Sequence, residues 1–233
     1  TEYILQQHSE QFTKDMNKSN PLGSGGRVAE AYACLLKAIW SGQHVSISPQ
    51  QFKITIASFA QQFNNSHQHD AQELASFLID GIHEDLNRFN VQQIRNEIYI
   101  ETNEIHAMDD PSLAIKTWKH HLLRNDSIVV DRFQGMHRTH VRCPHCDKQS
   151  TKFDIYSSLS LTLVGRTDGQ PIDLHSCLQH FSRDELLDDR NAWYCTNCKE
   201  NVNATKSVQL WSAPDILILH LKRFTYQSSK RYG

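Results

Sequence analysis

The sequence predicts an α+β protein, helical in its N-terminal half and built from antiparallel strands in its C-terminal half. Apolar residues recur at spacings of three and four up to about residue 126, whereas from about Ser127 they alternate with polar residues. Two Cys-x-x-Cys pairs lie in the alternating part and add a zinc ribbon to the predicted fold. We therefore predict a helical region, residues 1–126, and a β-rich region, residues 127–233.

Length and composition are those of an ordinary globular protein. The 233 residues include 24 basic and 26 acidic side chains, a net charge of 24 − 26 = −2, and 39% are hydrophobic. No apolar run approaches the ~20 residues of a membrane span, and no secretory signal opens the chain. Six cysteines are too few for a disulfide scaffold. We expect an intracellular protein, cytoplasmic or nuclear, that binds neither membranes nor nucleic acid.

Four helices are predicted in the N-terminal half. An apolar stripe over residues 27–42 predicts the first, and Ser48 followed by Pro49 suits the first turn of the second. A third begins near Asp70, and a fourth follows Pro111. Residues 90–111 are polar and aperiodic, which is typical of a loop or an insertion.

For the third and fourth helices the sequence also predicts which face packs against the core. In the third, Glu84, Asp85 and Arg88 lie away from the apolar stripe that forms this face. In the fourth, Trp118 and Leu122 are expected to face inward. The stripe of the third helix consists of Leu74, Phe77, Leu78, Ile82 and Leu86.

Strands are predicted where β-branched and alternating apolar residues are enriched. A short helix, residues 173–181, interrupts them. The predicted strands cover residues 128–133, 150–163, 204–211 and 215–224.

Two Cys-x-x-Cys pairs give the strongest local signal. Cys143 and Cys146 are separated from Cys195 and Cys198 by 48 residues. Each pair makes a turn that aims two thiolates at one point, and four thiolates form a closed tetrahedral site that leaves no position for a catalytic water. A redox pair would need only one Cys-x-x-Cys at a helix start, whereas these pairs lie among strands. We predict a structural Zn²⁺.

The remaining cysteines do not resemble nucleophiles. Cys177 shares a helical stripe with Leu174, Leu178 and Phe181, which predicts a buried, inert thiol. Cys34 lies in mid-helix, away from the N-terminal dipole that would lower its pKa.

Two carboxylates, Asp70 and Glu73, stand at positions i and i+3 in the first turn of the third helix. They can cap the helix and complement its dipole. A close acidic pair can also bind an arginine fork, with Gln68 as a further hydrogen-bonding group. The spacing does not decide between these roles.

The segment HQHDAQELASFLIDGIHEDLNRF, residues 67–89, resembles the glutamine/aspartate box of the ubiquitin-specific proteases. These are papain-like cysteine deubiquitinases with a right-hand architecture of thumb, palm and fingers. Further motifs of the family follow the same order along nearly the whole chain, Thr1 to about Phe224. They are NPLG, YACLLKAIWSG, the segment from RNDSIVV to SLSLTL, WYCTNC and DILILHLKRF.

The resemblance implies a role for each part of the chain. Asp70 and Glu73, with Gln68 nearby, would hold arginines of the ubiquitin tail. Phe224 would be a ubiquitin contact beside the catalytic cleft, and the cysteine pairs would lie at the tip of the fingers. Residues 1–126 would form the helical thumb region. The β-rich region would form fingers and palm.

The resemblance also implies a thiol-dependent ubiquitinyl hydrolase that cleaves the isopeptide or peptide bond after the C-terminal glycine of ubiquitin. The family needs a Cys box and a His box, and this sequence matches neither, so we assign no catalytic residue and expect the chain to be inactive alone. It is either the middle of a longer deubiquitinase or a naturally incomplete relative.

Two other functions stay open at this point. The chain could be a catalytically inactive ubiquitin-binding or scaffold protein. A zinc-ribbon nucleic-acid binder is disfavoured by the net charge of −2 and the lack of interleaved aromatic and basic residues.

Overall fold

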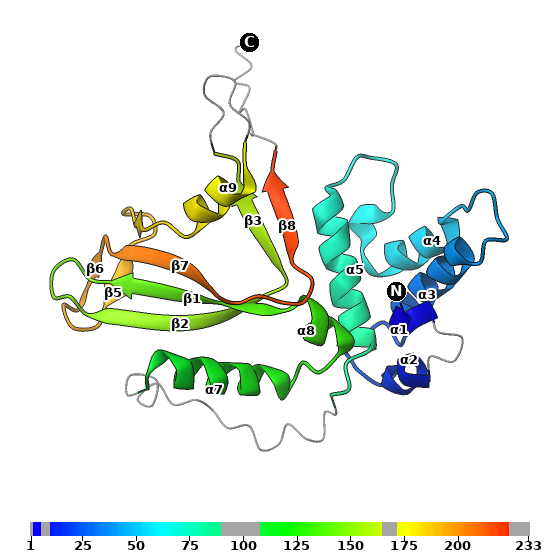
Figure 1. Cartoon of the computed structure of the whole chain (residues 1–233), viewed down its shortest axis with the longest axis horizontal. Coiled ribbons are helices and arrows are strands. Elements are labelled where there is room, and N and C mark those ends of the chain that lie inside the picture. Colours follow the sequence, from blue (N-terminus) through cyan, green and yellow to red (C-terminus); the bar gives the residue numbers. More distant parts are fainter. Residues whose placement is uncertain (1, 6–9, 90–107, 165–171, 224–233) are drawn as a thin grey trace, which may run out of the picture. The chain divides into compact units, whose positions relative to one another are not determined.

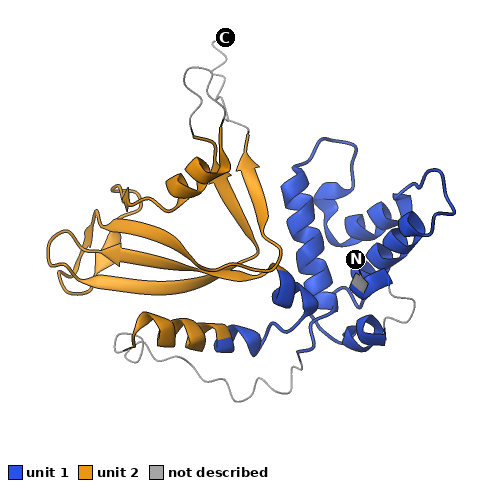
Figure 2. Ribbon diagram, in the orientation of Figure 1, with its two compact units in different colours: residues 1–99, 119–132 blue, residues 100–118, 133–233 orange. Residues whose placement is uncertain are grey.

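The structure is a computed structural model, and it describes residues 2–5, 10–89, 108–164 and 172–223. The chain divides into two compact units (Figures 1 and 2). Unit 1 comprises residues 1–99 and 119–132, and unit 2 comprises residues 100–118 and 133–233. Helix α7 (Asp110–Leu122) contributes to both units, and the division at residue 126 stays a prediction.

Unit 1 is helical, as its periodic sequence predicts. Helix α3 contacts both α4 and α5, and the fully buried side chains of unit 1 include Val28 of α3, Ile56 of α4 and Leu86 at the end of α5. No helix in the described ranges is long and apolar enough to cross a membrane. The elements before α7 are α1 (Glu2–Leu5), α2 (Glu10–Asp15), α3 (Arg27–Trp40), α4 (Gln50–Phe59), η1 (Gln61–Phe63) and α5 (Ala71–Asp85).

The predicted first strand is wrong, because residues 128–133 form helix α8 (Ile128–Phe133). The side chain of Ser127 accepts hydrogen bonds from the backbone N–H groups of Val129 and Val130, at 3.2 and 3.3 Å. This cap starts a helix despite the β-branched residues that follow it. The cap therefore outweighs the local β propensity.

Unit 2 contains a four-stranded antiparallel sheet with the order β2-β1-β7-β4. Figure 1 shows its three long strands β2, β1 and β7 side by side. The predicted strands 204–211 and 150–163 correspond to β7 and to β2 with β3. The strands are β1 (Gly135–Arg142), β2 (Gln149–Tyr156), β4 (Glu185–Leu186) and β7 (Thr205–Ser212).

Two smaller sheets also lie in the described part of unit 2. Strands β3 and β8 pair in parallel, and β5 and β6 form an antiparallel hairpin. Helix α9 packs on β3. These elements are β3 (Ser158–Thr162), α9 (Leu174–Phe181), β5 (Trp193–Cys195), β6 (Glu200–Val202) and β8 (Ile218–Lys222).

Strand β1 is central in the main sheet although its sequence, GMHRTHVR, has too few apolar residues to predict a strand. Its polar side chains find partners across the sheet and from α7. Arg138 forms an ion pair with Asp110 of α7 at 2.7 Å. His140 forms a hydrogen bond with Thr151 of β2 at 3.2 Å.

The unit 2 part of α7 lies against this sheet, and Trp118 is partly buried there, as predicted. Leu122 is 38% exposed, so its predicted inward position is wrong. The buried residues of this core are Leu113, Ala114, Met136 and Phe153.

Asp85 was expected on the polar face of α5 but is fully buried. One carboxylate oxygen accepts the backbone N–H groups of Ser24 and Gly26, at 2.6 and 3.2 Å. The other accepts the N–H groups of Val28 and Ala29, both at 3.1 Å, and the Ser24 hydroxyl at 2.6 Å. Helix α3 has no side-chain cap of its own, so Asp85 of α5 supplies it.

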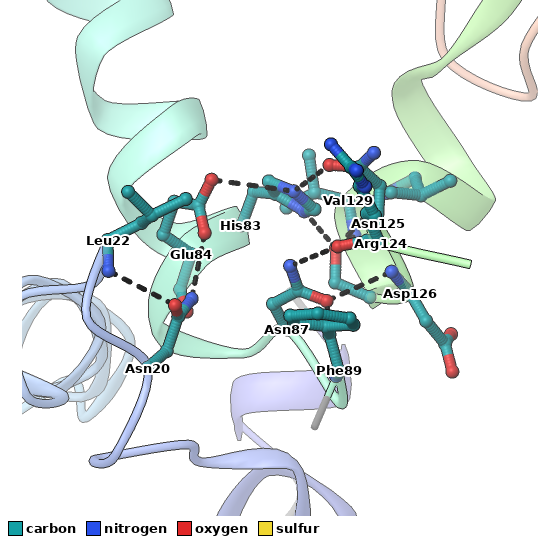
Figure 3. A network of polar contacts seen from close by, with 12 residues as sticks. Asn20, Leu22, His83, Glu84, Asn87, Phe89, Arg124, Asn125, Asp126 and Val129 are labelled. Carbon is teal, nitrogen blue, oxygen red and sulfur yellow. Dashed lines mark hydrogen bonds and ion pairs between the residues drawn. The ribbon is translucent and has the colours of Figure 1, made fainter. Parts of the chain in front are cut away.

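A second polar network fixes the C-terminal end of α5 to the segment before α8 (Figure 3). Asn87 donates to the carbonyl of Arg124 at 2.9 Å and accepts the N–H of Asp126 at 3.0 Å. The buried ring of His83 contacts the Ser127 hydroxyl at 2.7 Å and Asn125 at 3.3 Å.

Arg88 links the same region to α2. Its guanidinium lies 2.9 Å from Asp15 and 2.8 Å from Asp126. Tyr3 and Gln11 each donate to Asp15 at 2.6 Å. Burial alone would raise the pKa of Asp15, but the hydrogen bonds from Arg88, Tyr3 and Gln11 outweigh it and lower this pKa.

We expect Asp85→Ala to lower the free energy of unfolding by about 3 kcal/mol, because it leaves several buried N–H groups without an acceptor. Urea unfolding at neutral pH measures this change. Asp80→Ala, on the exposed side of the same helix, is the matched control and should stay within about 0.5 kcal/mol of the parent. Equal effects of the two substitutions would contradict the capping role.

The lowered pKa of Asp15 predicts a pH-dependent contribution to stability. Because the folded pKa lies below the unfolded value of about 3.9, the contribution is fully present above that value and is lost as pH falls through the folded pKa. Asp15→Asn should therefore be less stable than the parent at pH 7, with a smaller difference at pH 3. A difference that is constant between these two pH values in urea unfolding would refute the assignment.

Candidate metal centre and acidic helix start

The four cysteines of the two Cys-x-x-Cys pairs lie together in unit 2. Their Sγ atoms are all within 4.8 Å of one another, and they could hold a metal ion. The Sγ–Sγ distance is 3.8 Å from Cys143 to Cys198 and 3.6 Å from Cys146 to Cys195. Each close contact thus joins one pair to the other.

The two pairs reach this position from different hairpins. Cys143 and Cys146 lie in the turn between β1 and β2, whereas Cys195 ends β5 and Cys198 lies in the turn between β5 and β6. Cys143 and Cys195 are fully buried, and their partners are partly exposed. The buried side chains of Val202 and Ala204 and the partly buried Val141, Leu187 and Trp193 form an apolar shell.

Both turns have the same backbone geometry. The N–H of Asp147 donates to the carbonyl of Cys143 at 3.2 Å, and the N–H of Lys199 donates to the carbonyl of Cys195 at 2.7 Å. Asp147 and Lys199, each directly after the second cysteine of its pair, adopt left-handed φ angles of 58° and 60°. This conformation costs about 1 kcal/mol for a non-glycine residue, so the remaining contacts of the turn must stabilise it.

The sulfur positions fit a tetrahedral thiolate site. A Zn–S distance of ~2.3 Å in a regular tetrahedron places the sulfurs ~3.8 Å apart, close to the two measured separations. Closed shells of four soft ligands suit zinc. The donor set and its spacing therefore fit a structural ion.

The surroundings of the cluster favour a thiolate. Hydrogen bonds from the side chain of Asn197 and the backbone N–H of Lys148 lower the pKa of Cys146 to about 6. Its hydrogen bond to Cys146 and, secondly, burial raise the pKa of Cys198. Sequence reasoning did not identify Asn197, although it lies within the second pair.

The acidic start of α5 belongs to unit 1. Asp70 is the N-cap, and its side chain accepts the N–H of Gln72 at 2.8 Å. Glu73 follows in the first turn, and both carboxylates are exposed, as is Gln68 before them. The capping hydrogen bond uses one carboxylate oxygen of Asp70, and both acidic side chains remain accessible to solvent in the first turn of α5. Phe224 lies outside the described residues.

The other two cysteines have the surroundings that the sequence predicts. Cys177 is 1% exposed within α9, where it packs in an apolar cluster with Leu159 and Leu161. Cys34 is exposed but lies in the middle of α3. Neither has the helix N-terminal position that activates a thiol.

The family model described as ubiquitin carboxyl-terminal hydrolase matches residues 1–232. The chain belongs to this family. The predicted kinship with ubiquitin-specific proteases is therefore confirmed. The two cysteine pairs and the acidic start of α5 both lie within the matched residues.

Relatives in the family share about two fifths of their aligned residues with this chain. Ubiquitin carboxyl-terminal hydrolase 4 of Rattus norvegicus is 40% identical over 168 residues, which is 72% of this chain. Ubiquitin carboxyl-terminal hydrolase 19 of Homo sapiens is 42% identical over 165 residues, or 71% of this chain. The matches cover 17% of the first protein and 12% of the second, so the chain spans a small part of the length of these curated relatives.

Solved structures confirm the fold class. A SAGA DUB module with Ubp8, Sgf11, Sus1 and Sgf73, bound to monoubiquitin, matches with a TM-score of 0.61 and 19% identity. The match covers 96% of this chain and 43% of that chain. The same module bound to ubiquitin aldehyde matches with a TM-score of 0.59 and 20% identity, over 96% of this chain and 42% of the other. This α+β fold is therefore that of a ubiquitin-specific protease.

Proposed function

We propose that this chain is the ubiquitin-recognising part of a deubiquitinating cysteine protease, which hydrolyses the isopeptide or peptide bond after the C-terminal glycine of ubiquitin. The family match across residues 1–232 carries the proposal. Ubiquitin and ubiquitinated proteins are the proposed partners. The ubiquitin-bound state of the similar solved structures supports this choice.

The acidic start of α5 is the proposed binding site for the ubiquitin tail. Asp70 and Glu73 place two negative charges on one exposed turn, and arginine side chains of a bound tail would pair with them. Gln68 precedes them and adds an exposed amide. Phe224 is proposed as a further ubiquitin contact on the family resemblance alone.

The proposed ion of the cysteine cluster is a structural Zn²⁺. Cys143, Cys146, Cys195 and Cys198 would supply four thiolates, which leaves no open position for substrate or water. The ion would join the β1–β2 turn to the β5–β6 turn and so stabilise the end of unit 2. The role of the ion would be structural, because four thiolate ligands leave zinc no position at which to bind and activate water or substrate.

A second candidate function is that of a catalytically inactive ubiquitin-binding or scaffold protein. It is favoured by the surroundings of the six cysteines, because four form the cluster, Cys177 is buried and Cys34 lies in mid-helix. Assays of the longest natural protein that contains these residues distinguish the two functions. Hydrolysis of ubiquitin conjugates, or reaction with an electrophile on the ubiquitin C-terminus, supports the protease, and binding without either supports the scaffold.

Charge removal at the acidic turn should weaken ubiquitin binding by about tenfold for Asp70→Asn and for Glu73→Gln, since each loses a charge-assisted pair. Asparagine is as good an N-cap as aspartate, so Asp70→Asn keeps the helix start intact. Calorimetric titration of the chain with ubiquitin measures the dissociation constants. Glu10→Gln, at an exposed glutamate of α2, is the matched control and should bind like the parent. Unchanged affinity in both acidic variants would refute the proposed site.

Elemental analysis should find one zinc per chain, and a chelator should lower the free energy of unfolding by ~3 kcal/mol or more, since metal-binding energy is part of the folding energy. Cys146→Ser should lose the metal. Cys34→Ser removes an exposed thiol outside the cluster and should retain both zinc and stability. Full stability of the parent after verified metal removal would contradict a structural role.

A further inference from the structure

The loop before α5 carries three consecutive exposed residues, 68–70, of which the middle one also makes side-chain contacts within unit 1. Gln68 and Asp70 are exposed and belong to the proposed tail-binding site. His69 lies between them, and its ring centroid is 5.3 Å from that of buried Phe63 in an edge-to-face arrangement. The His69 ring is thus a fixed point within the proposed site.

Asn65 is the polar partner of this ring. Its Oδ1 atom lies 2.8 Å from Nε2 of His69 and also accepts the N–H of His67 at 2.8 Å. Its Nδ2 atom donates to the carbonyl of Gln62 at 2.9 Å, and its own carbonyl accepts Nζ of Lys53 from α4 at 3.2 Å. Asn65 therefore ties His69 to three other points of unit 1.

These contacts favour the tautomer of the His69 ring that carries its hydrogen on Nε2. Asn65 orients its amide nitrogen toward a carbonyl and its oxygen toward a backbone N–H, so the oxygen acts only as an acceptor. Nε2 of His69 must then carry the hydrogen that it donates. A glutamine amide can make the same donation, because its Nε2 atom reaches a similar distance from the backbone.

The ring contact continues into α5 itself. Phe63 packs edge-to-face against Phe77, two helical turns from the N-cap, with ring centroids 5.9 Å apart. His69 is therefore connected through Phe63 to the helix that carries Glu73. The backbone of residues 68–70 is held from both sides, by the cap of α5 and by the His69 ring.

We infer that His69 is a positioning residue for ubiquitin binding: its hydrogen bond to Asn65 and its packing on Phe63 fix the backbone that presents Gln68 and Asp70 to the ubiquitin tail. The inference rests on the proposed function. In this role His69 lowers the entropic cost of binding, because the loop is ordered beforehand.

The test compares three variants in calorimetric titrations with ubiquitin. His69→Ala should weaken binding about fivefold, the effect of losing one ordering hydrogen bond. His69→Gln should restore most of the affinity because it keeps the donor to Asn65. His67→Ala is the matched control, since His67 enters the network through its backbone N–H, and it should bind like the parent.

Amide hydrogen exchange gives a second readout that does not depend on ubiquitin. The N–H of His67, bonded to Asn65, should exchange faster in His69→Ala but not in His69→Gln. A thermal unfolding midpoint close to that of the parent shows that the effect is local. A purely structural role of His69 would lower this midpoint and leave the affinity of the folded protein unchanged.

The outcomes separate this inference from the proposed function. If Asp70→Asn weakens binding but His69→Ala does not, the tail site stands and the positioning role of His69 is overturned. If His69→Gln is as weak as His69→Ala, the hydrogen bond to Asn65 is not the cause, and the inference is also overturned. If neither acidic variant changes the affinity, the proposed tail site itself fails, and with it the role of His69.

Discussion

The helical unit depends on one buried carboxylate. Asp85 is the last residue of α5, and its buried carboxylate accepts hydrogen bonds from the first N–H groups of α3, so one side chain joins the two helices. A glycine-rich loop followed by a helix is a common anion-binding arrangement, and here the protein's own side chain is the anion. Gly26 adopts a φ of 88°, and a Cβ atom there would lie 2.8 Å from Sδ of Met16. Glycine at position 26 is therefore required by its own backbone conformation, and removal of the Asp85 carboxylate would leave the N–H groups of the loop and of α3 unpaired.

Helix α5 carries this constraint to the candidate binding site. Its C-terminal end is fixed by Asp85, by the asparagine and histidine contacts shown in Figure 3, and by the ion pairs of Arg88. Its N-terminal end has fewer fixed points, namely the Asp70 cap and the Phe63–Phe77 contact. The order of the acidic turn thus depends on the loop before it.

The sequence predicts the parts of this structure that rest on periodicity or on fixed spacing. Helices α3 and α5 and the two Cys-x-x-Cys pairs are of this kind, although Trp40 and Leu74, from the predicted apolar stripes, are 66% and 36% exposed. It does not predict strand β1, because the polar residues of GMHRTHVR acquire partners such as Asp110 and Thr151 only in the folded unit. It also misplaces Asp85 and residues 128–133, where a long-range cap and a local serine cap outweigh propensity. The acidic pair was identified, but the contacts of the neighbouring His69 ring with Asn65 and Phe63 could not be read from spacing.

The cysteine cluster shows how a distant pairing can depend on strand register. Strand β7 pairs with β1 so that Thr205 lies opposite Arg142, the residue before Cys143. Ala204 precedes Thr205 in the chain, and its carbonyl accepts the N–H of Leu187 at 2.9 Å. A slip of one residue would move the β5–β6 turn by about 3.4 Å along the strand and reverse the faces of its side chains. That displacement is close to a whole sulfur–sulfur separation, so the four thiols would no longer converge on one point. A bound ion would therefore select this register over its neighbours, and the pairing of β1 with β7 and the metal site would stabilise each other.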